Sequence, residues 1–156
     1  MSTTMQKISI EKVKHSKIDQ VDFDNLSFGS VFTDHMLVCD YKDGAWETPK
    51  ITPYQPITLD PSSKIFHYGQ SIFEGMKAYK DTENKVWLFR PLDNFKRLNI
   101  SAKRMAIPEI PEEYFMEGLK ALVEVDKNWI PQKDGSSLYI RPFVFASGKG
   151  FHASPA

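Results

Sequence analysis

GMKAYKDTENKVWLFRPLDNFKRLNISAKRM, residues 75–105, changes from the pattern of a β-hairpin to that of an α-helix at a single proline. In the first half, Asp81 to Asn84 form a polar turn, and the KVWLFR that follows is rich in strand formers. Pro91 is a favoured first residue of a helix, because that position needs no backbone N–H donor. After it, apolar residues recur at helical spacing until Pro108, and they predict one buried stripe: Leu92, Phe95, Leu98, Ala102 and Met105.

The flanking segments complete an alternating order of strands and helices. HMLVCDYKDGAWETPKI, residues 35–51, predicts two strands around a turn at residues 42–44, and SLYIRPFVF, residues 137–145, predicts one last strand. Pro111 opens a second helix, which we expect to continue to Pro131. Its predicted apolar stripe is Phe115, Leu119, Leu122, Val125 and Trp129. Strands followed by two main helices and a further strand predict an α+β fold with a mostly antiparallel sheet.

Composition narrows the class of partner. Twenty basic residues balance twenty acidic ones, so we expect neither nucleic acid nor a membrane surface as a partner. Cys39 is the single cysteine, which excludes an internal disulfide and favours a reducing, cytoplasmic location. No run approaches the ~20 apolar residues of a membrane helix. The four histidines lack metal-ligand spacing, so no metal site is expected.

HYGQSIFEGMKAY, residues 67–79, places aromatic side chains around two glycines. Glycines at this spacing let the backbone turn sharply or approach another group closely. Tyr68 and Phe73 are side chains of the kind that line small-molecule pockets. Aromatic residues more often belong to a core, however, so the residues alone favour a packed turn over a binding site.

Two arginines are candidate anion ligands. In LYIRP, residues 138–142, Tyr139 and Arg141 lie two residues apart on a strand and therefore face the same side. Arg141 would bind a carboxylate if that face is buried, or water if it lies at an edge, and the residues alone favour neither. Arg97 lies beside the apolar stripe of the first helix, where it is either solvated or a phosphate ligand.

Four segments in this order resemble the N-terminal part of branched-chain amino-acid aminotransferases, which are pyridoxal-phosphate enzymes of fold type IV. They are FGSVFTDHM (28–36), HYGQSIFEGMKAY (67–79), FRPLDNFKRL (89–98) and SLYIRP (137–142), and the resemblance runs from about Phe28 to about Gly150. It implies a homodimer that transfers the amino group of leucine, isoleucine or valine to 2-oxoglutarate. Small amino acids and 2-oxo acids are the implied ligands.

The resemblance also implies roles for individual residues. Arg97 would hold the phosphate of pyridoxal phosphate. Tyr139 would bind the α-carboxylate of the substrate, and Arg141 the distal carboxylate of glutamate or 2-oxoglutarate. Phe73 and Phe28 would line the side-chain pocket. Tyr68 would reach into the active site of the neighbouring subunit.

The resemblance implies no catalytic residue within this chain. In the family, the lysine that binds the cofactor lies downstream in a larger domain, and neither Lys77 nor Lys149 matches its position. We therefore expect an N-terminal extension over residues 1–27, a small α+β domain over 28–147 and the start of an interdomain loop over 148–156. The large catalytic domain would be absent, and the chain alone inactive.

Two alternative functions remain at this point. One is another enzyme of the same fold type, such as a D-amino-acid aminotransferase or a related lyase. The other is a non-catalytic binding or assembly module that keeps the small-domain fold.

Overall fold

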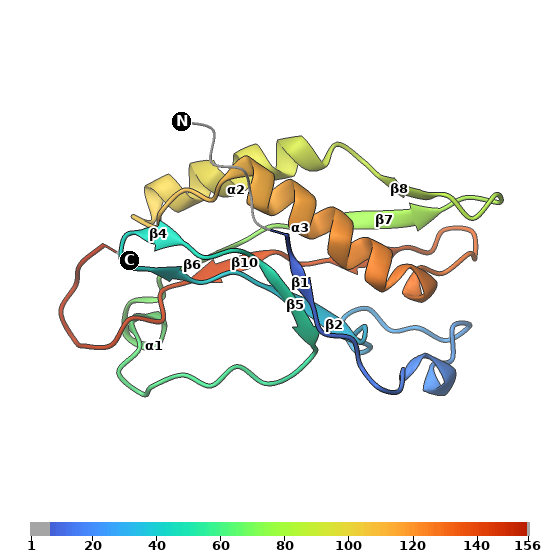
Figure 1. Cartoon of the computed structure of the whole chain (residues 1–156), viewed down its shortest axis with the longest axis horizontal. Coiled ribbons are helices and arrows are strands. Elements are labelled where there is room, and N and C mark those ends of the chain that lie inside the picture. Colours follow the sequence, from blue (N-terminus) through green and yellow to red (C-terminus); the bar gives the residue numbers. More distant parts are fainter. Residues whose placement is uncertain (1–6, 156) are drawn as a thin grey trace.

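Two long helices lie side by side over the strands of the protein (Figure 1). The structure is a computed structural model that describes residues 7–155. Helix α2 spans Pro91–Arg104 and helix α3 spans Glu112–Val125. The shorter elements are α1 (Lys64–Tyr68) and the 3-10 turns η1 (Ile18–Gln20) and η2 (Lys127–Trp129). No helix in this part of the chain is long and apolar enough to cross a membrane.

The strands form four small sheets within the described residues. Their orders are β1-β5-β2, β3-β4, β8-β7-β9 and β10-β6, and every pairing is antiparallel except the parallel one between β1 and β5. The α+β prediction with mostly antiparallel strands is confirmed. The strands are β1 (Ser9–Ile10), β2 (His35–Val38), β3 (Tyr41–Lys42), β4 (Ala45–Trp46), β5 (Lys50–Pro53), β6 (Ser71–Phe73), β7 (Met76–Lys80), β8 (Val86–Leu88), β9 (Leu138–Ile140) and β10 (Phe143–Phe145).

Residues 75–105 fold as the sequence predicts. Strands β7 and β8 pair as a hairpin, and the Asp81 carboxylate at its turn accepts hydrogen bonds from the backbone N–H groups of Glu83 and Lys85. Helix α2 begins at Pro91, and the middle of its apolar stripe is buried in the core. The two ends of the stripe are exposed, so the prediction of one buried stripe was wrong for them. The buried members are Phe95, Leu98 and Ala102, and the exposed members are Leu92 and Met105.

The second helix is shorter than predicted. It ends at Val125, and Trp129 belongs instead to η2. The chain leaves the helix where the Asp126 carboxylate turns inward to accept two hydrogen bonds from His35. The buried face of α3 is Phe115, Gly118, Leu119 and Val123, while the predicted Leu122 and Val125 are only half-buried.

The last predicted strand is two strands in two different sheets. β9 pairs with β7, and β10 pairs with β6. The break falls at residues 141–142, because Pro142 has no N–H to donate to a sheet ladder. The Pro142 carbonyl instead accepts the backbone N–H of Glu74 at 2.9 Å. The prediction of one continuous strand was wrong.

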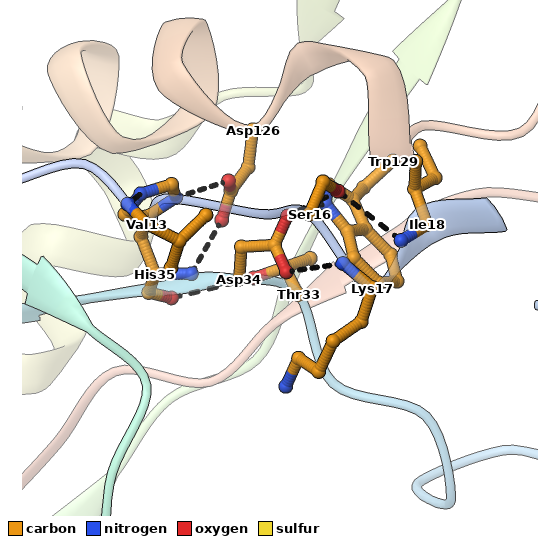
Figure 2. A network of polar contacts seen from close by, with 9 residues as sticks. All are labelled: Val13, Ser16, Lys17, Ile18, Thr33, Asp34, His35, Asp126 and Trp129. Carbon is orange, nitrogen blue, oxygen red and sulfur yellow. Dashed lines mark hydrogen bonds and ion pairs between the residues drawn. The ribbon is translucent and has the colours of Figure 1, made fainter. Parts of the chain in front are cut away.

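A polar network around the buried Asp34 carboxylate fixes the N-terminal segment to the residues that follow α3 (Figure 2). The Asp34 carboxylate accepts the Ser16 hydroxyl at 2.5 Å, the Lys17 backbone N–H at 3.0 Å and the Trp129 indole N–H at 3.1 Å. Burial opposes ionisation of Asp34, but these hydrogen bonds outweigh it and lower the pKa of the carboxyl. They join residues 16 and 17 to residue 34 and thereby close the base of the loop between them.

The same network continues through a buried histidine (Figure 2). His35 contacts Asp126 through Nδ1 at 2.6 Å, and its Nε2 accepts the Val13 backbone N–H at 3.0 Å. Because Nε2 accepts, the ring proton lies on Nδ1. The network links β2, α3 and the N-terminal segment without an exposed charge.

Candidate functional site

Tyr139 and Arg141 form the centre of the candidate site. Arg141 donates two hydrogen bonds to the Tyr139 hydroxyl oxygen, from Nε at 3.1 Å and from Nη2 at 2.9 Å. Both bonds use the hydroxyl as an acceptor, which leaves its own O–H free to donate. Three of the five N–H groups of Arg141 have no partner among residues 7–155. The predicted shared face is confirmed, and it presents several donors together.

Two phenylalanines enclose this pair. The Arg141 guanidinium carbon lies 4.4 Å from the centre of the Phe73 ring, which is a cation–π contact. The Phe28 ring meets the Tyr139 ring edge-on at 5.0 Å between centroids. Phe28 is 78% exposed and Phe73 is 62% exposed, so both aromatic surfaces are open to a ligand. The structure thus brings together four of the predicted substrate residues from three distant segments.

The two glycines of residues 67–79 have different functions. Gly69 caps α1 in the left-handed conformation, with φ of +60°, and so turns the chain from the helix into β6. Gly75 lies against Tyr139, because a Cβ at this position would be 2.3 Å from the tyrosine hydroxyl oxygen. Both functions that the sequence suggests for glycine, a sharp turn and a close approach, occur in this segment.

Tyr68 lies apart from this cluster. It is the last residue of α1, and its hydroxyl donates to the Phe151 carbonyl of the C-terminal segment. The Phe151 ring in turn packs edge-on against His67, at 4.9 Å between centroids. Tyr68 therefore contacts the C-terminal segment, whereas Phe73, five residues later, contacts Arg141.

Arg97 belongs to a second polar centre. Its Nε and Nη2 each donate to one oxygen of the Glu74 carboxylate at 2.6 Å. Asn94, one turn earlier on α2, donates to the same carboxylate at 3.0 Å. The Arg97 hydrogen bonds outweigh burial and lower the pKa of Glu74, and Glu74 in turn raises the pKa of Arg97. The sequence-based alternatives for Arg97, solvation or a phosphate contact, did not include this ion pair with Glu74.

Arg97 has the donor chemistry that a phosphate group requires. Its side chain is 66% exposed while that of Glu74 is 5% exposed, so the pair lies across the surface with the arginine outward. Nη1 has no hydrogen-bond partner within the described residues. A planar guanidinium with free N–H groups binds phosphate oxygens well. The residues present therefore fit the phosphate group that the sequence resemblance implies.

Of the other basic candidates, Lys77 lies beside the site, because it is exposed on β7 directly opposite Tyr139 in the β7–β9 pairing and shares a face of the sheet with it. Lys149 lies elsewhere and pairs with Asp60 at 3.2 Å. Among residues 7–155, no group of three or more histidine, cysteine or acidic side chains is arranged to hold a metal ion.

Sequence reasoning gave no role to Glu74 or Asn94, although both lie in the motifs that carry the resemblance. A signal for Glu74 exists, because it continues the inward alternation of Ile72 and Met76, which are both buried. A carboxylate at an inward-facing position of a strand requires a hydrogen-bonding or ionic partner. The signal does not identify that partner, which lies 23 residues away on α2.

Comparison with known proteins places these features in context. No protein-family model matches the chain. The chain is 52% identical over 145 residues to branched-chain-amino-acid aminotransferase 2 of Bacillus subtilis, a match that covers 92% of this chain and 40% of that protein. It is 50% identical over 143 residues to a probable branched-chain-amino-acid aminotransferase of Staphylococcus epidermidis, covering 91% and 39%.

Solved structures agree with the fold. A branched-chain amino-acid aminotransferase from Escherichia coli matches with a TM-score of 0.55 and 26% identity, over 68% of this chain and 34% of that chain. One from Thermoproteus uzoniensis with norvaline matches with a TM-score of 0.51 and 27% identity, over 76% and 34%. The chain spans about two fifths of the length of the curated relatives it matches. The resemblance seen in the sequence is confirmed: this chain is similar to the N-terminal portion of the branched-chain amino-acid aminotransferases.

Proposed function

We propose that this chain is the N-terminal domain of a pyridoxal-phosphate-dependent branched-chain amino-acid aminotransferase. The enzyme would transfer the amino group of leucine, isoleucine or valine to 2-oxoglutarate and release glutamate. The observation that carries the proposal is the Tyr139–Arg141 pair, whose donors converge beside Phe73 and Phe28. The high identity to named aminotransferases supports it.

This cluster suits a pocket that must accept two kinds of substrate. The open aromatic faces of Phe73 and Phe28 would contact a branched apolar side chain. The free N–H groups of Arg141 would bind the distal carboxylate of glutamate or 2-oxoglutarate, and the Tyr139 O–H would donate to the α-carboxylate. Because Tyr139 already fixes the guanidinium plane, little conformational freedom is lost when a carboxylate arrives.

Arg97 would bind the cofactor phosphate. Pyridoxal phosphate, when bound, supplies the electron sink for amino-group transfer. The contribution of this chain would be a charge-assisted hydrogen bond from the exposed guanidinium to a phosphate oxygen. When no phosphate is bound, the Glu74 carboxylate compensates much of the positive charge of Arg97.

We further propose a cytoplasmic homodimer in which Tyr68 contacts the active site of the second subunit. Its exposed position at the end of α1 suits contact with another subunit. The single cysteine supports a reducing compartment. Burial raises the pKa of the Cys39 thiol to about 11, which leaves it unreactive.

An assay of the longer protein that begins with this sequence tests the function. With pyridoxal phosphate and 2-oxoglutarate, L-leucine should yield glutamate, and D-alanine should yield none. Glutamate formation from D-alanine, without any from L-leucine, would contradict the proposal and favour a D-amino-acid aminotransferase.

The 156-residue chain on its own provides a second test. We propose that it forms no stable lysine adduct with pyridoxal phosphate, because neither Lys77 nor Lys149 matches the position of the cofactor lysine that the resemblance implies. Absorbance spectra of the mixture, before and after borohydride treatment, measure such an adduct. A stable adduct together with turnover of L-leucine by this chain would be incompatible with this assignment.

A further inference from the structure

Glu74 is held from both its backbone and its side chain. Its backbone N–H donates to Pro142, where β9 and β10 separate, at 2.9 Å. Its two carboxylate oxygens accept from Arg97 in a fork-to-fork arrangement, and Asn94 donates to one of them. Asn94 also donates to the Gly75 carbonyl at 3.1 Å, which fixes its own amide. The carboxylate therefore has a defined position relative to both sheets and to α2.

The ion pair fixes the plane of an otherwise exposed guanidinium. An unpaired arginine on a helix surface samples many rotamers, and binding an anion would have to restrict them. Two bonds of 2.6 Å to a buried carboxylate restrict them in advance. Nε and one N–H of Nη2 are occupied by Glu74, and Nη1 stays free among the described residues.

We propose that Glu74 is a positioning residue, whose buried carboxylate orients Arg97 so that its remaining N–H groups can bind a phosphate group. The inference rests on the proposed function, in which Arg97 contacts the cofactor phosphate. The competing role for Glu74 is that of a rival anion, which phosphate would have to displace. The two roles predict opposite effects on phosphate affinity when the carboxylate is removed.

Nuclear magnetic resonance of the nitrogen-15-labelled 156-residue chain distinguishes them, with inorganic phosphate as the probe. The Nε–H signal of Arg97 is identified by its loss in Arg97→Lys. In the wild type it should exchange slowly with water, because it donates to a buried acceptor, and it should shift as phosphate binds. In Glu74→Gln the exchange should accelerate, and phosphate affinity should fall roughly three- to tenfold, the cost of ordering one side chain on binding.

Glu83→Gln is the matched control, since it removes the same charge from an exposed turn residue that pairs with Lys85. It should leave the Arg97 signal and the phosphate affinity unchanged. If Glu74→Gln does not fold, Glu74→Asp keeps the charge but shortens the reach, and it should also weaken phosphate binding.

Unchanged or tighter phosphate binding by a folded Glu74 variant would overturn the positioning role and leave Arg97 as the anion ligand. Phosphate affinity that is unaffected by Arg97→Lys, or no phosphate response in the wild type, would overturn the inference together with the role of Arg97. Neither result bears on transaminase activity, which the assay of the longer protein with L-leucine measures separately.

Discussion

The two candidate anion-binding arginines are held in opposite ways. Arg97 is fixed by a buried carboxylate, so the charge of the pair is compensated before any ligand arrives. Arg141 is fixed by neutral groups, the Tyr139 hydroxyl and the face of the Phe73 ring, and keeps its full positive charge. Both arginines are therefore oriented in advance, but only Arg141 has an uncompensated charge at short range.

This difference matches the ligands that the proposed enzyme would bind. A cofactor phosphate stays in place through every reaction cycle, so a charge-compensated partner can serve it. The distal carboxylate is present in only one half-reaction, and an apolar side chain replaces it in the other. Because neutral groups hold Arg141, its orientation requires no carboxylate beside it that would repel the carboxylate of the substrate.

The largest effect is expected from displacing Tyr139 from Arg141. Gly75→Ala in the longer protein would place a Cβ within van der Waals overlap of the tyrosine hydroxyl. A shift of about 1 Å in a positioning group lowers activity roughly 100-fold, and we expect a loss of kcat/KM of this order for L-leucine.

Gly148→Ala is the control, because its added Cβ would meet only Lys64 at an ordinary 3.9 Å. It should retain wild-type kcat/KM. Equal activity of the two alanine variants would show that the close approach of Gly75 does not matter for the site.

Arg141→Lys tests the proposed contact between Arg141 and the distal carboxylate of the substrate. Lysine keeps the charge but cannot contact both Tyr139 and a carboxylate with a planar fork. We expect kcat/KM for glutamate to fall about tenfold or more, the worth of a charge-assisted hydrogen bond, with a much smaller fall for L-leucine. Arg104→Lys, at the exposed end of α2, is the control for the substitution. A parallel loss on both substrates would refute a role in binding the distal carboxylate.

Asp34→Asn tests whether the polar network around Asp34 anchors the loop that carries Phe28, which lies against Tyr139. Asp34 closes the base of the loop that carries Phe28, and asparagine cannot accept from all three of its donors. Denaturant unfolding of the chain should show a loss of about 1–3 kcal/mol, the cost of weakening the hydrogen bond from the buried Trp129 indole N–H. The exposed Asp19→Asn is the control, with no expected change. Stability equal to the wild type would remove the network as the anchor of this loop.

The smallest expected effect is a pH dependence specific to Arg97. Because Arg97 lowers the pKa of Glu74, the pair contributes stability above the unfolded-state pKa of the glutamate and loses it as the pH falls through the lower folded-state value. The difference in unfolding free energy between wild type and Arg97→Gln should therefore shrink on acidification below about pH 4.5. Arg141→Gln should show no such convergence, since no carboxylate among residues 7–155 pairs with Arg141. A constant difference for Arg97→Gln across this range would contradict the linkage.

Local sequence patterns were sufficient to predict the features whose interacting residues are close together in the sequence. The β7–β8 hairpin, the centre of α2 and the shared face of Tyr139 and Arg141 all follow from turn chemistry and periodicity. The resemblance to a known family located Phe28, which has no periodic signal in its loop.

The features that sequence reasoning missed depend on distant partners. The strand break at Pro142 follows from the fact that β9 and β10 pair with different strands. Trp129 lies outside α3 because its indole N–H donates to Asp34, while Asp126, at the end of the helix, accepts the backbone N–H of His35. The strand alternation indicates that the Glu74 carboxylate is buried, but the sequence does not show that Arg97 is its partner.

The chain crosses from one sheet to the other twice, at residues 74–75 and 141–142, and the two crossings lie together. The Glu74 N–H to Pro142 carbonyl bond joins them. The two crossings together form the junction between the β6–β10 pair and the β8–β7–β9 sheet. Arg97 is bound to this junction through Glu74, and Arg141 is part of it. A ligand held by either arginine would therefore also resist bending of one sheet against the other.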